Sequence, residues 1–209
     1  MAFLSCVDFS DLGGMRKHRY CVAHHLSGRY ASVDKSKYGR VTRYQKRQDY
    51  INNGFVNTPT NNSGLSTDVM VKGAVVVRIG DDNSYHHFAD GICKGVFQSK
   101  HLVSISSHQA PLGVPHSQGS TGHEYTVTEM ELLSELSTAE AIQYENWVIP
   151  AVQDVIAGKV PTSDPFGMLS ITIDLIHYAQ NNGLKLDLIQ PKNVMKRGST
   201  WVHIDPFGF

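Results

Sequence analysis

The most constraining feature of the chain is its segment 183–209, which places oxygen-bearing side chains on two loops. A polar loop carries Asp187 and Asn193, and Asp205 follows a short apolar strand. A hairpin turn over 196–199 is expected to fold the two loops toward one site. Mg²⁺ prefers such oxygen donors, completed by water and substrate phosphates. The segment therefore predicts a site for a metal-bound phosphate ester, with Asn193 and Asp205 as the metal ligands.

The same segment resembles the catalytic and metal-binding loops of protein kinases, in which H-R-D-L-x-x-x-N is followed by D-F-G. Residues 191–195, Pro-Lys-Asn-Val-Met, match the end of the first motif, and residues 205–208, Asp-Pro-Phe-Gly, resemble the second. This form is similar to the short serine/threonine kinases of short-tailed bacteriophages. The resemblance implies a protein kinase that uses ATP and magnesium and acts on host proteins.

The catalytic position of this resemblance leaves two alternatives open. When the loop is aligned without gaps to Asn193, the catalytic Asp of the family falls on Leu188, and Asp187 lies one position early. Either the loop carries a one-residue insertion and Asp187 turns inward, or there is no catalytic carboxylate. The first alternative implies Asp187 and Asn193 as catalytic residues. The second implies a pseudokinase-like protein that binds and inhibits a host protein.

Upstream of this segment, the hydrophobic pattern predicts elements in an order similar to that of a kinase N-lobe and hinge. β-Branched runs on both sides of Lys72 and Gly73 favour a hairpin. A later segment begins with good N-cap residues and keeps apolar side chains at helical spacing. The elements expected are a hairpin over 65–80, a helix over 81–97, a strand over 100–107, a loop over 111–122 and a strand over 123–130.

The resemblance assigns nucleotide-binding roles to residues of these elements. The loop before the hairpin stands where kinases have a glycine-rich loop, and Arg78 stands where they have the phosphate-pairing lysine. The helix lacks the Glu that usually pairs with this cation, so Asp81, Asp82 and Asp90 are its only local substitutes. The residues implied to bind ATP are Ser63, Gly64, Ser66, Arg78, Glu129 and Glu131.

Two helical segments are expected between the hinge and the polar loop. Residues 137–160 read as one or two helices that begin at a capping box of Ser137 and Glu140. Residues 167–182 read as the clearest helix, with Gly183 as its C-terminal stop. The side chains expected to face inward from this second helix are Leu169, Ile173, Leu175, Ile176 and Ala179.

Together these elements predict an α+β protein with a truncated two-lobe, protein-kinase-like fold. The antiparallel β N-lobe and hinge are expected over 51–136, and a minimal helical C-lobe with both loops over 137–209. A chain of 209 residues with 41% hydrophobic content can bury one substantial core or two small lobes that share one. Residues 1–50 are expected to be a basic, poorly periodic extension, and 51–64 a loop or hairpin.

The charge of the chain is unevenly distributed although it sums to zero. Residues 1–50 hold ten Lys or Arg against four Asp, with tyrosines interleaved. Such a pattern could bind single-stranded nucleic acid through residues 16–47 by phosphate pairing and base stacking. The simpler interpretation, which we favour, is a solvated surface whose tyrosines cover the lobe beneath.

The cysteines and the hydropathy of the chain indicate in which cellular compartment the protein is expected. The three cysteines, Cys6, Cys21 and Cys93, are an odd number without close spacing, which favours a reducing compartment over a disulfide framework. No stretch reaches the roughly 20 apolar residues that a membrane span needs. The sequence therefore predicts a cytoplasmic protein, in the host cell if it is phage-encoded, with no membrane partner.

Overall fold

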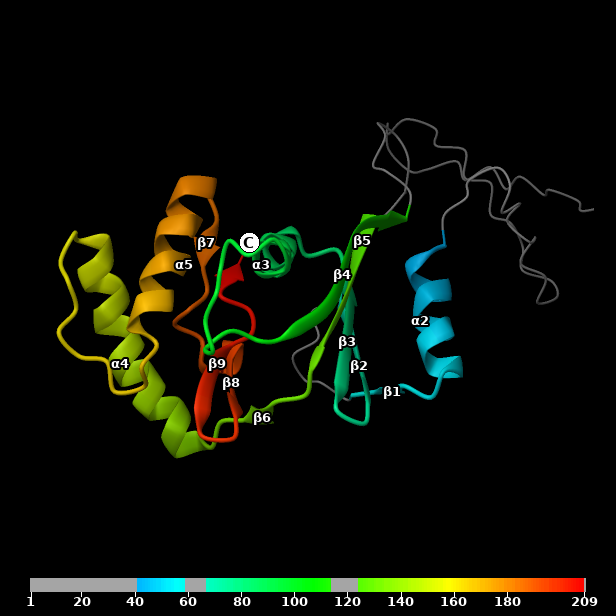
Figure 1. Ribbon diagram of the computed structural model, residues 1–209, viewed down its shortest axis with the longest axis horizontal. Coiled ribbons are helices and arrows are strands. Elements are labelled where there is room, and N and C mark those ends of the chain that lie inside the picture. Colours follow the sequence, from blue (N-terminus) through cyan, green and yellow to red (C-terminus); the bar gives the residue numbers. More distant parts are fainter. Residues whose placement is uncertain (1–40, 59–66, 114–123, 209) are drawn as a thin grey trace, which may run out of the picture. The chain divides into compact units, whose positions relative to one another are not determined.

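The computed structural model describes residues 41–58, 67–113 and 124–208, which belong to the second of two units into which the chain divides, Arg40–Phe209. This unit has a mixed α+β fold, as predicted, with a five-stranded antiparallel sheet and helices (Figure 1). Ser63, Gly64 and Ser66 lie outside the described residues, as does the basic run before residue 40. No described helix is long and apolar enough to cross a membrane.

Along the chain, the helices are separated by groups of strands, except that α5 follows α4 directly. The helices are α2 (Arg43–Asn52), α3 (Asn83–Cys93), α4 (Thr138–Ile156) and α5 (Leu169–Asn182), with a 3₁₀ turn, η1, at Pro191–Asn193. The strands are β1 (Val56–Asn57), β2 (Thr67–Lys72), β3 (Val75–Gly80), β4 (Ile105–Gly113), β5 (Glu124–Glu131), β6 (Ser134–Glu135), β7 (Lys185–Leu186), β8 (Val194–Arg197), β9 (Thr200–His203) and β10 (Phe207–Gly208).

The five-stranded sheet has the order β1-β2-β3-β5-β4. The predicted hairpin is confirmed: β2 and β3 pair along their whole length, and Gly73 in the turn takes a positive φ of 57° that favours glycine. The predicted strand at 123–130 is also confirmed as β5, which pairs with β3 and β4. The sheet has its own hydrophobic cluster, made by Met70, Val77, Ile79, Tyr125 and Val127.

Strand β4 differs from the sequence expectation of a strand over 100–107 followed by a loop at 111. It begins at Ile105 and continues to Gly113, with register shifts along β5. One shift lies between Gln109 and Leu112, where Pro111 cannot donate to a ladder. Because β4 is an edge strand, the sheet tolerates that proline at an irregularity.

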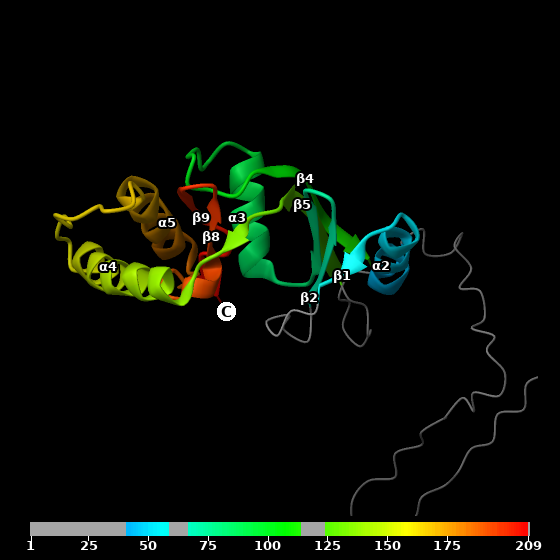
Figure 2. The ribbon, with the colours of Figure 1, turned by 90° about the horizontal axis from the view of Figure 1, so that it is seen from below.

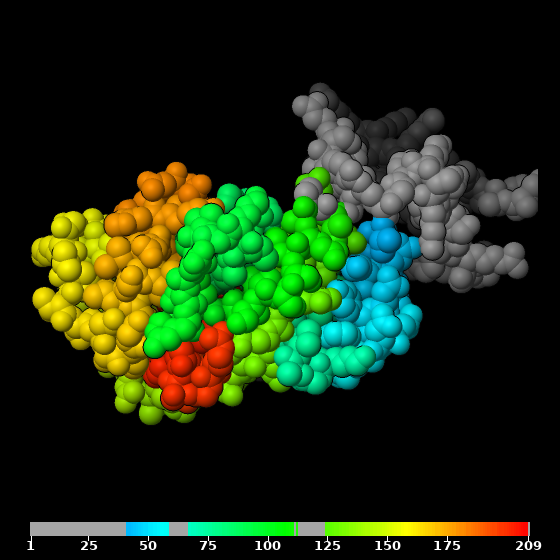
Figure 3. Space-filling view, viewed as in Figure 1, coloured from blue at the N-terminus to red at the C-terminus, as the bar shows by residue number. Residues whose placement is uncertain are grey.

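The residues just before β4 pair with the C-terminal hairpin instead of the sheet. Val103 N donates to His203 O at 3.1 Å, and His203 N donates to His101 O at 2.8 Å. Figure 3 shows the two segments, green and red, packed against one another. The alternating pattern of residues 100–104 therefore reflects pairing with β9.

Helix α2 was not predicted, and it crosses the boundary expected at residue 50. It begins at a capping box of Thr42 and Gln45, and its C-terminal part packs Tyr50 and Ile51 against the sheet cluster. Arg43, together with Arg47, forms ion pairs with Asp68 of β2 at 2.9 and 3.3 Å. This basic segment is therefore packed on the sheet, so the expectation of irregular structure is wrong for residues 43–52.

Helices α4 and α5 lie side by side and bury the larger hydrophobic cluster (Figures 1 and 2). The predicted capping box is confirmed, because Ser137 and Glu140 bond reciprocally at the start of α4. Residues 138–156 form one helix that continues through Pro150. Helix α5 ends at Gly183, as predicted, with a φ of 66°. Its buried side chains are Ile171, Thr172, Leu175, Ile176 and Ala179. Leu169 lies at the edge of the cluster, and Ile173 is only half-buried, so the inward orientation predicted for these two side chains is not seen.

The C-terminal segment forms the predicted hairpin, in which β8 pairs with β9 and β6 adds a third strand. A second short pair joins β7 to β10, with Phe207 opposite Leu186. Phe207 is buried in the larger cluster. These two pairings bring the loop after β7 next to the turn that carries Asp205.

Candidate functional site

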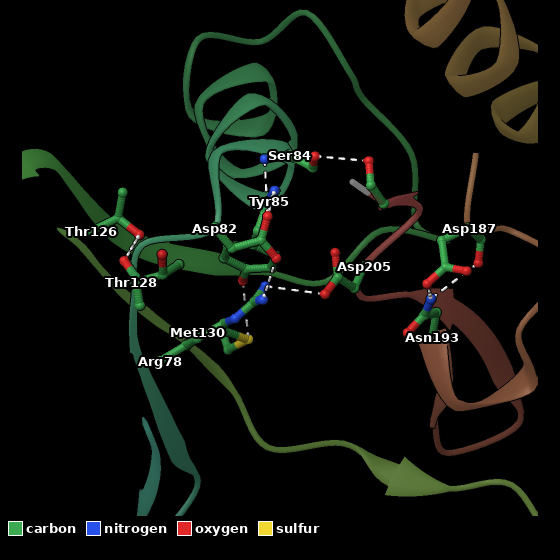
Figure 4. A network of polar contacts seen from close by, with 12 residues as sticks. Arg78, Asp82, Ser84, Tyr85, Thr126, Thr128, Met130, Asp187, Asn193 and Asp205 are labelled. Carbon is green, nitrogen blue, oxygen red and sulfur yellow. Dashed lines mark hydrogen bonds and ion pairs between the residues drawn. The ribbon is translucent and has the colours of Figure 1, made fainter. Parts of the chain in front are cut away.

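The loop between β7 and η1 turns the side chain of Asp187 toward Asn193 (Figure 4). The buried Asn193 amide donates from Nδ2 to Asp187 Oδ2 at 2.7 Å and to Asp187 O at 3.0 Å. Leu188 points into the core and is 1% exposed. Asp187 therefore has the inward orientation that the first of the two alternatives requires.

Neighbouring elements hold this loop in place. Tyr144 of α4 is buried and donates its hydroxyl to Leu188 O at 2.7 Å. Asp187 N donates to Pro206 O at 2.8 Å, which joins the loop to the turn that follows Asp205. The two polar loops are therefore adjacent, and the backbone of one is fixed by the backbone of the other.

Arg78 on β3 lies between two carboxylates that come from different parts of the chain. Its Nη2 is 2.9 Å from Asp82 Oδ2, and its Nη1 is 3.2 Å from Asp205 Oδ2. The guanidinium also stacks 3.5 Å from the ring centroid of Tyr85. Since the Arg78 side chain is only 14% exposed, these contacts are partly shielded from solvent and hold the cation in one position.

Asp82 has a second role as the N-cap of α3. Its Oδ1 accepts from the backbone amides of Ser84 and Tyr85, while its Oδ2 binds Arg78. The sequence expectation named Asp82 only as one of three local substitutes for the absent Glu. The N-cap pattern in the sequence could have singled out Asp82, because Asp82 stands at the N-cap position and Asp81 and Asp90 do not.

Asp205 is the most perturbed carboxylate of this site. Burial raises its pKa to about 6, Arg78 opposes that rise, and the negative charges of Asp82 and Asp187 add to it. Its Oδ2 binds Arg78, whereas its Oδ1 is buried and accepts no hydrogen bond from any described residue. A buried carboxylate oxygen without a partner, beside two further carboxylates, is suited to bind a cation.

The predicted metal ligands, Asn193 and Asp205, lie on neighbouring backbone segments, but the predicted meeting of their side-chain oxygens is not seen. Ile204 N donates to Asn193 O at 2.9 Å, but the Asn193 side chain faces Asp187 and the Asp205 side chain faces Arg78. Within residues 41–58, 67–113 and 124–208 no three His, Cys, Asp or Glu side chains form a metal-binding group. The oxygen donors in this region are the carboxylates of Asp187 and Asp205 and the amide of Asn193, which are ligand types that Mg²⁺ prefers.

The two hinge residues implied to bind ATP are engaged elsewhere. Glu129 lies inside the sheet, opposite Val77 on β3, and its side chain accepts from Tyr50 Oη at 2.7 Å. The Glu131 carboxylate binds Arg197, and its backbone N–H donates to Ser104 O at 3.1 Å. Both side chains therefore stabilise the sheet and its junction with β8, and sequence spacing alone does not reveal these partners.

A separate shallow hollow of about 320 Å³ lies between α4 and residues 161–163. Its lining includes Trp147, Pro150 and Asp154, and it shares no residue with the cluster around Arg78. The candidate site is thus defined by converging polar groups, and it comprises Arg78, Asp82, Asp187, Asn193 and Asp205. Neither the models of known protein families nor the curated proteins give a match to the chain, so its functional interpretation rests on this geometry.

Proposed function

We propose that the chain is a serine/threonine protein kinase of the phage type, which uses ATP and Mg²⁺ to phosphorylate a host protein. One observation carries the proposal: a strand cation and the polar groups of two later loops converge. Arg78 contacts Asp205 at 3.2 Å, and Asp187, whose backbone is bonded to Pro206, contacts Asn193 at 2.7 Å. Phosphoryl transfer needs mainly positioning and charge neutralisation, and these groups can supply both.

Arg78 is the group that would bind the nucleotide phosphates. It keeps the positive charge that the family places on this strand, and its guanidinium can hold phosphate oxygens through two hydrogen bonds. Asp205 Oδ1 and the amide oxygen of Asn193 are the atoms that would hold Mg²⁺. When bound, the ion neutralises phosphate charge that develops during transfer.

Asp187 is the group that would orient the acceptor hydroxyl. Its Oδ2 accepts from the Asn193 amide, while its Oδ1 accepts no hydrogen bond from a described residue. Oδ1 can therefore accept the proton of a serine or threonine hydroxyl as its oxygen attacks the γ-phosphorus and the bond to the leaving ADP breaks. The buried side chain of Leu188 and the bond from Tyr144 keep this carboxylate in position.

The test measures nucleotide binding and phosphoryl transfer separately. Mg·ATP is expected to raise the melting temperature of the protein, because a ligand that binds the native state stabilises it. Radiolabel from γ-labelled ATP is expected to reach a protein substrate, and Asp205→Asn is expected to abolish the transfer. Asp174→Asn, at an exposed aspartate of α5, is the matched control. Transfer that continues unchanged in Asp205→Asn would contradict the proposal.

A second candidate is a pseudokinase-like protein that binds and inhibits a host protein without catalysis. One observation favours it: Arg78 is already occupied by Asp82 and Asp205, so a phosphate must compete with a carboxylate. This candidate predicts no thermal shift with millimolar Mg·ATP. A nucleic-acid-binding role of residues 16–47, which we do not favour, predicts binding that weakens steeply with salt.

A further inference from the structure

One of the two ion pairs of Arg78, the one with Asp82, is local to the turn between β3 and α3. Asp82 lies four residues after Arg78 and directly before the first residue of α3. One carboxylate thus binds the strand cation through Oδ2 and the first amides of the helix through Oδ1. The cation and the helix start are therefore held by the same group.

This arrangement differs from a kinase in which the partner of the strand cation lies on a movable helix. There the lysine–glutamate pair forms only when the helix is correctly placed, and its placement controls activity. Here the carboxylate belongs to the helix N-cap, so rotation of the rest of α3 does not carry it away from Arg78.

Helix α3 is also anchored along its length. The hydroxyl of Ser84 donates to Gly208 O at 2.9 Å, and Tyr85, Phe88 and Ala89 are buried. Movement of the helix would break the contact with β10 and expose three core side chains. The position of α3 is therefore fixed by the same strand that follows Asp205.

We propose that Asp82 is a positioning residue that presets Arg78 for nucleotide binding, so that the site needs no movement of α3 to become competent. This inference rests on the proposed function. Asp82 also shares the charge of Arg78 with Asp205. Without Asp82, Arg78 would be bound by Asp205 alone, and the Asp205 carboxylate would be less available to a cation.

The charges of the site indicate how removal of the Asp82 carboxylate would change the binding of Mg·ATP. Three carboxylates, Asp82, Asp187 and Asp205, stand against the single positive charge of Arg78, so the site carries a surplus of negative charge. A divalent cation relieves this surplus. Removal of the Asp82 charge reduces the attraction for the cation and leaves Asp205 as the one ion-pair partner of Arg78 among the described residues.

The first experiment separates the ionic role of Asp82 from its capping role. Asn and Ser cap helices about as well as Asp, so Asp82→Asn and Asp82→Ser should keep α3 folded. Both variants lose the charge-assisted bond to Arg78. We expect the dissociation constant of Mg·ATP, measured by calorimetry, to rise about tenfold, or roughly 1.4 kcal/mol. Asp81→Asn, at the exposed neighbouring aspartate, should leave it unchanged.

The outcomes are distinguishable from those of the proposed function. If the unmodified protein gives no binding heat with Mg·ATP, the proposed function fails, and this inference fails with it. If the protein binds Mg·ATP and both Asp82 variants bind as tightly, the inference alone is overturned. If the Asp82 variants melt at a lower temperature but bind Mg·ATP as tightly as the unmodified protein, the role of Asp82 is only structural.

A second measurement tests the preset geometry in the unmodified protein. Hydrogen exchange at the amides of Ser84 and Tyr85, which donate to Asp82, should show equal protection with and without a Mg·ATP analogue. A several-fold change in exchange of these amides on nucleotide binding would show that the start of α3 moves, and would overturn the inference.

Discussion

Gly91 in α3 offers a test of the packing behind the candidate site, because its replacement by alanine has two opposing effects. In the interior of a helix, alanine is favoured over glycine by about 1 kcal/mol. A Cβ at this position would lie 2.5 Å from Cε2 and 2.8 Å from Cδ2 of Phe97. Distances this short require the ring or the helix to move.

The Phe97 ring has little room to move. It is 4% exposed, and its centroid lies 4.8 Å from that of Tyr178 and 6.4 Å from that of Phe207. Its backbone N–H donates to Gly91 O at 3.3 Å. Overpacking of a filled core costs about 1–3 kcal/mol. Because this exceeds the gain in helix propensity, Gly91→Ala should lower the free energy of unfolding by about 1 kcal/mol.

The assay is a double-mutant cycle followed by urea and thermal unfolding. Gly91→Ala alone should lower the melting temperature by about 2–4 °C. In a Phe97→Leu background the smaller side chain leaves space for the Cβ, so the same change should raise stability by up to about 1 kcal/mol. A stabilising effect of Gly91→Ala in the original chain, or the same sign in both backgrounds, would refute the reasoning.

Three further predictions concern single side chains. Tyr144→Phe removes the hydrogen bond to Leu188 O, so urea unfolding should show a free energy of unfolding that is lower by about 1 kcal/mol. Because this bond positions the loop that carries Asp187, the same change should lower kcat in a phosphoryl-transfer assay more than it raises the KM for ATP. Burial lowers the pKa of His203 to about 3, so below pH 6.5 the unfolded chain takes up a proton that the native state excludes. Stability measured by urea titration should therefore fall by about 1.4 kcal/mol per pH unit from this group, and His203→Gln should remove that part of the slope. Arg197→Met leaves the half-buried Glu131 carboxylate and two backbone carbonyls without their donor, so calorimetry should show a loss of about 1–2 kcal/mol. Lys192→Met, at an exposed lysine, should change little.

The regular part of the fold was accessible from sequence because its signals are local. The β2–β3 hairpin is marked by β-branched runs around Gly73, and α4 by the capping box at Ser137. Helix α2 was missed because only one face of its last turn packs against the sheet cluster. Its other contacts are the ion pairs of Arg43 and Arg47 with Asp68, which lies 25 and 21 residues further along the chain. Long-range pairs of this kind leave no periodic pattern.

The candidate site was accessible only in part for the same reason. The sequence identified Arg78, Asp187, Asn193 and Asp205 from their order, but not which of them touch. Whether Asp187 or Leu188 faces inward depends on the insertion of Leu188 into a core that is built mainly by α4, α5 and the C-terminal strands. The pairing of Arg78 with Asp205 depends on how the C-terminal hairpin packs, which no local spacing encodes.

The pairing of residues 101–103 with β9 ties the start of β4 to the C-terminal hairpin, and so links the five-stranded sheet to the larger hydrophobic cluster. The sheet can detach from the helices only if these hydrogen bonds and the contacts of Arg197 with Lys100 O and Leu102 O break together. Residues 40–209 should consequently melt in one transition, with equal calorimetric and van't Hoff enthalpies. Because Arg78 of β3 binds Asp205 shortly after β9, the candidate site should lose its geometry in that same transition.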